Sequence, residues 1–318
     1  MASDKSHMLS KLLQAQSSEA ISQSVVSAQV SAIENLVIPH SEIARAARIQ
    51  ARTYTSGGRI FFAGSGASAM AILMDSSEIA RSYGLQESRF FFDCVGPIPL
   101  SSYLLERSED DVNWAETKAN RIGHGDCVIA VSSSGSTPYT LRYAEVARRN
   151  GADVISLSSN QEGGLSQVAN LPILIETGTE LICGSSRLSS GTAQKIILNA
   201  LSICFGVELG AVYNGHLVNL KMDNAKLRYQ GIRTIAYLAD VSLEAAEEAL
   251  KFAGNIKLAI LMLKLGFTLD EAQARLDATG GNLAYAIDNY ADINLKNAPL
   301  CPKAVEPHPE YYSGTTTP

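Results

Sequence analysis

Short apolar runs alternate along the chain with longer segments whose apolar residues recur at helical spacing. The runs are typical of strands in a parallel sheet covered on both faces, because such strands are buried on both sides. We expect five of them, at residues 59–63, 89–93, 127–131, 153–157 and 171–175. Pro172 cannot donate a ladder hydrogen bond, which predicts an edge strand or a strand start at that point. Strands that alternate with helices predict an α/β fold with a parallel sheet.

Helical periodicity and proline positions predict the helices around this sheet. Residues 9–55 carry apolar side chains at helical spacing with a break around Pro39, so two N-terminal helices are expected. The helix expected at 138–149 opens with a proline, whose missing N–H costs nothing at a first helical position. A long helix is expected at 191–209, followed by a loop around 213–215.

Composition divides the chain into five stretches. Residues 1–8 (MASDKSHM) resemble a cloning remnant, residues 9–55 form the N-terminal helices, and residues 56–235 form the α/β domain. Residues 236–296 are rich in Ala, Leu, Glu and Lys and predict a three-helix module that resembles a ubiquitin-associated fold. Such helices are far more often simple packing than a partner site, so we assign the module no separate binding role. Residues 297–318 are Pro-rich and polar, which predicts a flexible tail.

The overall composition is that of a soluble globular protein. Of the 318 residues, 46% are hydrophobic and 18% charged, and the net charge is -6. Lysine and arginine are scattered and the balance is acidic, which argues against a nucleic-acid surface. The sequence has no run of roughly 18 apolar residues, and its N-terminus lacks a basic region followed by an apolar segment. We therefore predict a cytoplasmic protein with no membrane partner.

Cysteine and histidine are dispersed. The five cysteines are an odd number without CxxC spacing, which is typical of free thiols in a reducing compartment. The five histidines include no pair at metal-ligand spacing. The sequence therefore predicts no metal site.

Two of the expected strands lead into turns of similar composition. Residues 64–68 (GSGAS) and 132–137 (SSSGST) are rich in small and hydroxylated side chains, and each precedes a helical segment. Such turns suit an anion, since a helix N-terminus offers free N–H groups and hydroxyls add donors without bulk. Neither matches a dinucleotide fingerprint, and no Gly-Lys-Ser/Thr supports a P-loop. On this pattern alone, a phosphate site and plain serine-capped turns are equally open.

Longer motifs resemble a known family. Residues 131–139 (VSSSGSTPY) resemble the phosphosugar loop of the sugar isomerase (SIS) superfamily. Three further stretches are similar to the N-acetylmuramic acid 6-phosphate etherases, namely 64–78 (GSGASAMAILMDSSE), 180–195 (ELICGSSRLSSGTAQK) and 215–227 (GHLVNLKMDNAKL). The resemblance covers about residues 57–281. It implies a flavodoxin-like SIS domain with three αβα layers, and a homodimer whose active sites lie near the subunit interface.

The resemblance also implies an activity and its catalytic groups. These lyases, which belong to amino-sugar metabolism and peptidoglycan recycling, cleave the lactyl ether at C3 of the phosphosugar by elimination and water addition, without a cofactor. The reaction needs a base for the C2 proton and an acid for the departing ether oxygen. Glu78 matches the acid, and Glu106, within residues 104–110 (LLERSED), matches the base. From their own pattern both would be solvated surface charges.

Binding residues for the small-molecule phosphosugar follow from the same resemblance. Hydroxyls of the two turns would hold the phosphate, from Ser65, Ser68, Ser133, Ser134 and Thr137. Three residues of the 180–195 stretch would lie near the sugar: Glu180, Ser185 and Lys195. From its own pattern, Lys195 is equally well a surface residue of a helix.

Two positions depart from the etherase pattern. Met70 and Ser136 stand where the family usually carries arginine, and an arginine–anion contact is geometrically demanding. The phosphate donors are kept while positive charge around them is lost. Three functions stay open: an etherase acting on N-acetylmuramic acid 6-phosphate or a related phosphosugar, a non-catalytic phosphosugar-binding regulator, and an aldose–ketose phosphosugar isomerase. The retained carboxylate pair favours the etherase, since a pure regulator has no need of it.

Overall fold

The computed structural model describes residues 17–34, 36–95, 109–178, 180–182 and 184–287. Contacts divide the chain into two compact units. The first comprises Met1–Glu78 and Gln86–Phe205, and the second comprises Ile79–Leu85 and Gly206–Pro318. Glu106 and the segments 1–8 and 297–318 lie outside the described residues.

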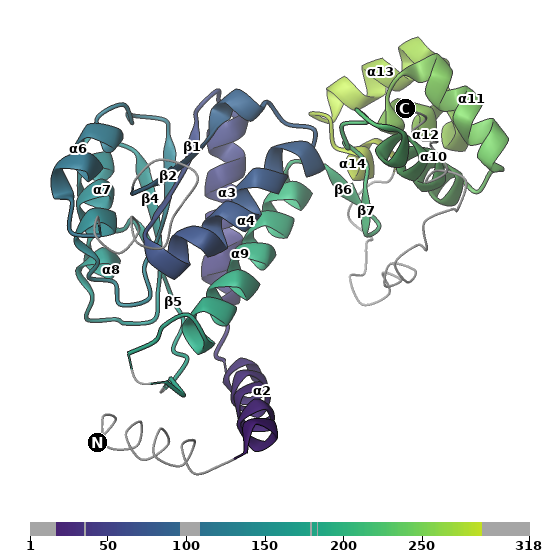
Figure 1. The fold of residues 1–318 in the computed structure, drawn as a ribbon. Helices are drawn as coiled ribbons and strands as arrows, with labels where there is room; N and C mark the ends of the chain where they lie inside the picture. Colours follow the sequence, from purple (N-terminus) through teal and green to yellow (C-terminus); the bar gives the residue numbers. More distant parts are fainter. Residues whose placement is uncertain (1–16, 35, 96–108, 179, 183, 288–318) are drawn as a thin grey trace, which may run out of the picture. The chain divides into compact units, whose positions relative to one another are not determined.

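A five-stranded parallel sheet forms the centre of the first unit (Figure 1). Its strands are β1 (Ile60–Gly64), β2 (Phe90–Cys94), β3 (Cys127–Val131), β4 (Asp153–Ser158) and β5 (Leu171–Leu174). The five strands expected from the apolar runs are confirmed. The spatial order β2-β1-β3-β4-β5 is the flavodoxin-like order. Pro172 lies on the edge strand β5, where no further ladder needs its missing N–H.

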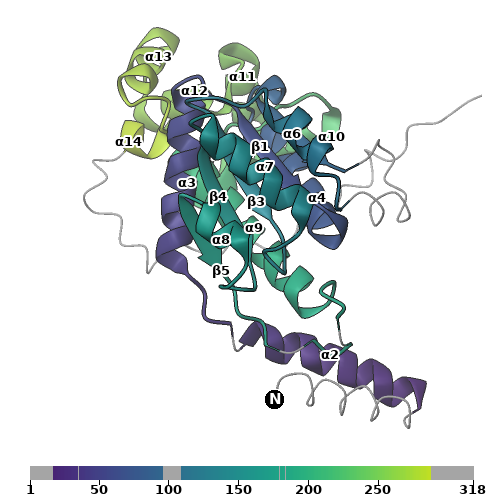
Figure 2. The ribbon, with the colours of Figure 1, turned by 90° about the vertical axis from the view of Figure 1, so that its left-hand side faces the viewer.

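Helices cover both faces of this sheet, which confirms the three-layer arrangement. One face carries α7 (Pro138–Arg149) and α8 (Gly164–Val168), with α6 (Val112–Ala119) packed against α7; Figure 2 looks onto this face. The other carries α3 (His40–Thr55), α4 (Gly66–Ser82) and α9 (Ser189–Glu208) (Figure 1). Successive strand residues point to opposite faces. Phe91 accordingly stacks on Phe61 at 4.7 Å between ring centroids, whereas Phe90 meets Phe205 of α9 at 6.3 Å.

The helices that precede and follow the strands also agree with the prediction. Helix α2 (Ser18–Glu34) and helix α3 are separated around Pro39, so the two expected N-terminal helices are confirmed. Helix α7 begins at Pro138, as its sequence indicates. The long helix expected at 191–209 is α9, which begins two residues earlier, at Ser189.

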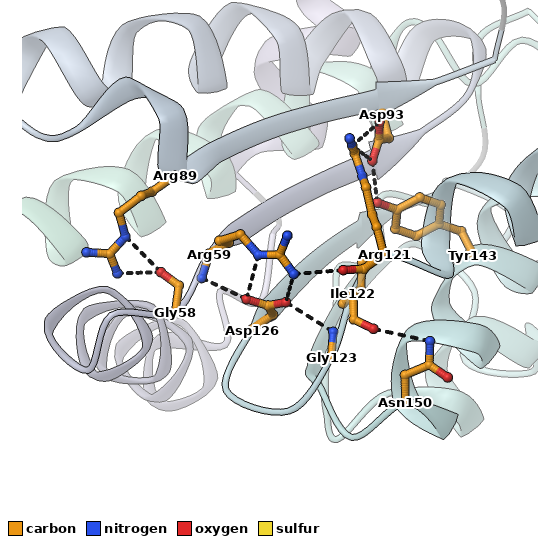
Figure 3. A network of polar contacts seen from close by, with 10 residues as sticks. All are labelled: Gly58, Arg59, Arg89, Asp93, Arg121, Ile122, Gly123, Asp126, Tyr143 and Asn150. Carbon is orange, nitrogen blue, oxygen red and sulfur yellow. Dashed lines mark hydrogen bonds and ion pairs between the residues drawn. The ribbon is translucent and has the colours of Figure 1, made fainter.

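Ion pairs between buried carboxylates and half-exposed arginines tie the strands to the loops around them (Figure 3). Arg59 precedes β1 and Asp126 precedes β3; the guanidinium donates to the carboxylate at 2.6 and 3.2 Å, and the Arg59 backbone N–H donates at 2.9 Å. On β2, the Asp93 carboxylate accepts from Arg121 at 2.6 and 2.7 Å and from the Tyr143 hydroxyl at 2.5 Å. The first pair joins the beginnings of β1 and β3 and so helps to set the two strands side by side.

The second unit contains a helical bundle. Its helices among the described residues are α10 (Ala225–Ala239), α11 (Leu243–Ala253), α12 (Ile256–Leu265), α13 (Leu269–Ala278) and α14 (Leu283–Ile287). Gly254 and Gly266 end α11 and α12 in the left-handed conformation, so the predicted helix breaks at these residues are confirmed. Helix α10 shares the bundle's core through Ile235, whereas the sequence grouped residues up to 235 with the α/β domain.

A β-hairpin stands where a loop was expected around residues 213–215. Strand β6 (Val212–Tyr213) pairs antiparallel with β7 (His216–Leu217), so the expectation was wrong for Tyr213. Asn214 and Gly215 connect the strands with φ of +46° and +75°. A two-residue hairpin turn needs positive φ at both residues, and Asn-Gly supplies it at low cost. Strands of two residues are too short for alternation to show in the sequence.

Candidate functional site

The two Ser/Thr turns lie next to each other at the carboxyl ends of the strands. Strands β1 and β3 are neighbours, with Gly64 opposite Val131, so the turns that follow them lie side by side. From this point the chain passes from β1 to β2 on one side and from β3 to β4 on the other. Such a switch point at the carboxyl ends of parallel strands is where open α/β sheets bind their ligands. The fold therefore places both predicted phosphate turns at the expected ligand site.

The first turn presents two buried hydroxyl side chains at the start of α4. Ser65 and Ser68 are 6% and 7% exposed. Within the part of the chain that the structure describes, the Ser65 hydroxyl has no hydrogen-bond partner. Gly66, the first residue of α4, has φ of +55°, a conformation that favours glycine. A buried, unpartnered hydroxyl at a helix N-terminus suits a ligand that accepts hydrogen bonds.

The second turn is organised by its own side chains. The Ser132 and Thr137 hydroxyls lie 2.8 Å apart, and the Ser134 hydroxyl accepts from the backbone N–H of Ser136 at 3.2 Å. Gly135 has φ of +66°, and its carbonyl accepts from the N–H of Leu165 at 2.9 Å. The turn is therefore held in one shape by contacts within itself and with α8.

Helix α9 supports the second turn through a side chain that the sequence did not single out. Gln194 is 1% exposed, and its amide Nε2 donates to the Ser133 hydroxyl at 2.8 Å. The only sequence signal was its place in the 180–195 motif, beside the Lys195 that we selected instead.

Glu109 is a second residue that sequence reasoning missed. Its backbone carbonyl accepts from the N–H of Tyr139, in the first turn of α7, at 2.9 Å. Its carboxylate lies against Gly66, because a β-carbon on Gly66 would stand 2.6 Å from Oε1. Glu109 therefore touches the starts of both α4 and α7. It lies in the same charged run as Glu106, which was the residue favoured from the motif.

The three residues predicted to lie near the sugar have three different environments in the structure. Glu180 caps α9, since its carboxylate accepts from the backbone N–H groups of Ser189 and Ser190 at 2.9 Å each. Ser185 is half-buried in the loop before α9, and its N–H donates to the carbonyl of Ile182. Lys195 has contacts of its own on α4 and α9.

Lys195 lies over a buried carboxylate of α4. Its Nζ is 3.5 Å from Asp75 Oδ1 and 2.5 Å from Asn199 Oδ1. Burial raises the pKa of Asp75, and the charge of Lys195 together with the Ser202 hydroxyl partly offsets this effect. The pair links α4 to α9 behind the two turns, so Lys195 has a structural contact in addition to its predicted role.

Glu78 is not brought to the turns within one chain. It is exposed on α4, ten residues after Ser68. A rise of 1.5 Å per residue puts it about 15 Å farther along the helix axis. Met70 and Ser136, which replace the expected arginines, are both exposed.

Among the described residues, no group of three or more His, Cys, Asp or Glu side chains is arranged to hold a metal ion. None of the described helices is both long and apolar enough to cross a membrane.

Comparison with known proteins places the chain in a family. Residues 24–159 match the SIS domain family model. The chain is 37% identical over 251 residues to N-acetylmuramic acid 6-phosphate etherase 2 of Bacillus licheniformis, which covers 78% of this chain and 84% of that protein. It is 36% identical over 229 residues to N-acetylmuramic acid 6-phosphate etherase of Deinococcus radiodurans, covering 71% and 75%.

A solved structure is similar at a greater distance. The phosphoheptose isomerase from Francisella tularensis is 18% identical with a TM-score of 0.42, covering 59% of this chain and 96% of that one, too distant to inform function. By contrast, the two etherases share more than a third of their aligned residues with this chain, over most of their length, which is enough to assign the family. This chain belongs to the N-acetylmuramic acid 6-phosphate etherase family.

Proposed function

We propose that this chain is a carbon–oxygen lyase that cleaves the D-lactyl ether of N-acetylmuramic acid 6-phosphate. The products are N-acetylglucosamine 6-phosphate and D-lactate. One observation carries the proposal: two Ser/Thr turns and the carboxylate of Glu109 meet at the switch point between β1 and β3, in a chain of the etherase family. The predicted cytoplasmic location and the lack of a cofactor requirement stay predictions.

The phosphate lies between the two turns in this proposal. Ser65, Ser68 and the free N–H groups of α4 face it from the first turn, and Ser133, Ser134 and Thr137 face it from the second. Neutral donors at helix N-termini bind a dianion without a cationic side chain. This accounts for a phosphate site that has Met70 and Ser136 where the family usually carries arginine. Anchoring the 6-phosphate leaves the sugar ring free to reach Glu109.

Glu109 is the described carboxylate best placed to act as the base. It removes the proton at C2, the electron pair of that C–H bond forms a C2–C3 double bond, and the C3–O bond breaks. The departing oxygen leaves as D-lactate and takes a proton from the acid, and water then adds at C3. Its contacts at both Gly66 and Tyr139 hold Glu109 beside the phosphate donors. Glu106 stays a predicted alternative for this role.

Glu78 stays the predicted acid, and its position has a consequence. A carboxyl that is exposed and about 15 Å along α4 from Ser68 serves the site only if a second copy presents it. We therefore propose that the active form is the predicted homodimer, in which Glu78 of one protomer acts at the turns of the other.

The test is D-lactate release from N-acetylmuramic acid 6-phosphate. Wild-type protein should release lactate, and Glu109→Gln should lose at least about a hundredfold in kcat, since general-base catalysis contributes roughly 10²–10⁴-fold. Glu162→Gln is the matched control, because Glu162 is an exposed glutamate after β4 and should leave kcat unchanged. Full activity of Glu109→Gln with loss in Glu106→Gln would transfer the base to Glu106.

The same assay separates the remaining alternatives. Phosphosugar binding without lactate release would favour the regulator, and interconversion of a 6-phosphosugar without loss of a substituent would favour the isomerase. For the shared site, inactive Glu78→Ala and Glu109→Gln proteins should be unfolded together and refolded as a mixture. Mixed dimers should regain about a quarter of wild-type activity per total protein, because half of the molecules are mixed and each has one intact site. No recovery would place the acid and the base on one protomer.

A further inference from the structure

A hydroxyl group that binds phosphate has to donate its proton to the anion. Serine can equally accept a hydrogen bond, so the direction of the O–H bond depends on what else the oxygen contacts. A hydroxyl oxygen that accepts a hydrogen bond from a protein donor directs its own O–H bond away from that donor, toward the ligand. The groups behind a phosphate turn can therefore decide whether its hydroxyls are ready to donate.

Ser133 has such a group behind it. The amide Nε2 of Gln194 donates to its hydroxyl oxygen at 2.8 Å, from a side chain that is 1% exposed. The backbone of Ser133 is fixed as well, because its carbonyl accepts from the N–H of Ser159 at 3.0 Å. Ser133 is thus held at its main chain by the loop after β4 and at its side chain by α9.

The carbonyl oxygen of the Gln194 amide is not held by a second hydrogen bond among the described residues. This oxygen, Oε1, is buried. A buried acceptor without a partner costs stability, so its presence calls for an explanation. Among the described residues, the contact with Ser133 is therefore the one hydrogen bond of this amide.

We propose that Gln194 is a positioning residue that donates to the Ser133 hydroxyl and so directs the Ser133 proton toward the bound phosphate. The proposal rests on the phosphate site of the proposed function and extends it, because it assigns a role to a residue that touches the turn and not the ligand. Helix α9, whose N-terminus Glu180 caps, carries this amide to the back of the second turn. The link also explains why a buried glutamine is tolerated in an apolar helix.

An isosteric substitution separates this role from packing. Gln194→Glu keeps the shape but replaces the donor by a carboxylate, which accepts the Ser133 proton and repels the phosphate. Gln194→Met removes the donor without adding charge. Binding of N-acetylglucosamine 6-phosphate, measured by calorimetry at pH 8, should weaken by about 2- to 10-fold in Gln194→Met and by at least about 30-fold in Gln194→Glu. In turnover the loss should appear in KM, with kcat little changed.

The pH dependence of phosphosugar affinity distinguishes this role from a purely structural one, which would leave the affinity ratio independent of pH. A carboxyl at position 194 has to be protonated to lie beside a bound phosphate, so the ratio of wild-type to Gln194→Glu affinity should rise between pH 6 and pH 9. Among the described residues, the charged groups near the site include Glu109, the Glu180 cap and the Asp75–Lys195 pair. Wild type and variant share all of them, so their titration cancels in the ratio.

The outcomes separate this inference from the proposed function. If wild-type protein binds no phosphosugar, the phosphate site itself is wrong. If wild type binds and Gln194→Glu binds equally well at pH 8, the site stands and the role of Gln194 is overturned. Should Gln194→Glu not fold, Gln194→Met is compared with Ser133→Ala and the double variant. The two effects should then be strongly non-additive, and additive effects would contradict the proposal.

Discussion

The carboxylate of Glu109 lies against Gly66, so close that a β-carbon on Gly66 would stand 2.6 Å from Oε1. This contact links the loop before α6 to the first residue of α4, and the Glu109 carbonyl links the same loop to α7 through Tyr139. One residue therefore touches the elements that follow both β1 and β3. These contacts hold the proposed base beside the proposed phosphate donors, and each contact can be disturbed separately.

Gly66→Ala should impair catalysis more than stability. The new methyl group meets Glu109 and the positive φ is strained, which should cost about 1 kcal/mol of unfolding free energy. Displacing the carboxylate should lower kcat for lactate release by roughly tenfold to a hundredfold. Gly57→Ala is the control, because Gly57 also has positive φ but its added β-carbon meets nothing within 4 Å. Equal kcat values for the two variants would refute the proposed role of the contact.

Ser65→Ala should weaken binding without lowering stability. The hydroxyl is buried and has no partner among the described residues, so removing it relieves an unsatisfied group. The melting temperature should stay the same or rise, while the Kd for N-acetylglucosamine 6-phosphate should increase about tenfold or more, since hydrogen bonds to charged groups are strong. Ser156→Ala removes another buried, unpartnered hydroxyl within β4 and should leave binding unchanged. An unchanged Kd in Ser65→Ala would remove Ser65 from the site.

The strands were predictable from the sequence because a buried parallel strand requires a continuous apolar run. The positions of the turns followed from the strands, since parallel neighbours end at one edge. Glu109 was not predictable, because it lies in a charged run that is typical of a solvated surface. Its role depends on a contact with Gly66, 43 positions earlier in the chain, across the edge of the sheet.

Glu180 has a structural role that its motif did not indicate. Its motif suggested a place beside the sugar, but no local pattern distinguishes a ligand carboxylate from one that caps a helix nine residues later. The backbone N–H groups of Ser189 and Ser190 are satisfied by this side chain only after the intervening loop has folded back. Loop closure of this kind is not encoded in periodicity.

Glu180→Ala should therefore lower stability. It leaves two N–H groups at the start of α9 without their acceptor and removes a negative charge from the positive end of the helix dipole. The expected loss is about 1–2 kcal/mol of unfolding free energy, measured by urea titration. Fluorescence of Trp114, the chain's one tryptophan, reports on the first unit. Glu176→Ala, at an exposed glutamate of the same loop, should cost much less. Equal losses would argue against the capping role.

Asp126 should make the stability of the first unit depend on acid pH. Burial alone would raise the pKa of Asp126, but hydrogen bonds from the Arg59 side chain and from the N–H groups of Arg59 and Gly123 outweigh burial and lower it. A carboxyl whose pKa is lower in the folded state stabilises the fold above the unfolded pKa, about 3.9, and this contribution is lost as pH falls below it.

Asp126→Asn should remove that dependence. At pH 7 it should lose about 1–2 kcal/mol of unfolding free energy, because the charge-assisted hydrogen bonds to the half-exposed Arg59 guanidinium are weakened. Between pH 5 and pH 3 its stability should fall less steeply than that of wild type. The check is a series of urea titrations of wild type and Asp126→Asn across this range. Parallel pH profiles for Asp126→Asn and wild type would contradict the assignment.

Cleavage of the ether on its sugar side makes the origin of the C3 oxygen diagnostic. The reaction is run on N-acetylmuramic acid 6-phosphate in water enriched in oxygen-18, and both products are examined by mass spectrometry. The account predicts a labelled oxygen at C3 of N-acetylglucosamine 6-phosphate, in addition to the C1 oxygen that the open-chain aldehyde exchanges with water, and D-lactate without label from the cleavage, because the sugar C3–O bond is the one that breaks. Label in D-lactate, or no release of D-lactate at all, would contradict it.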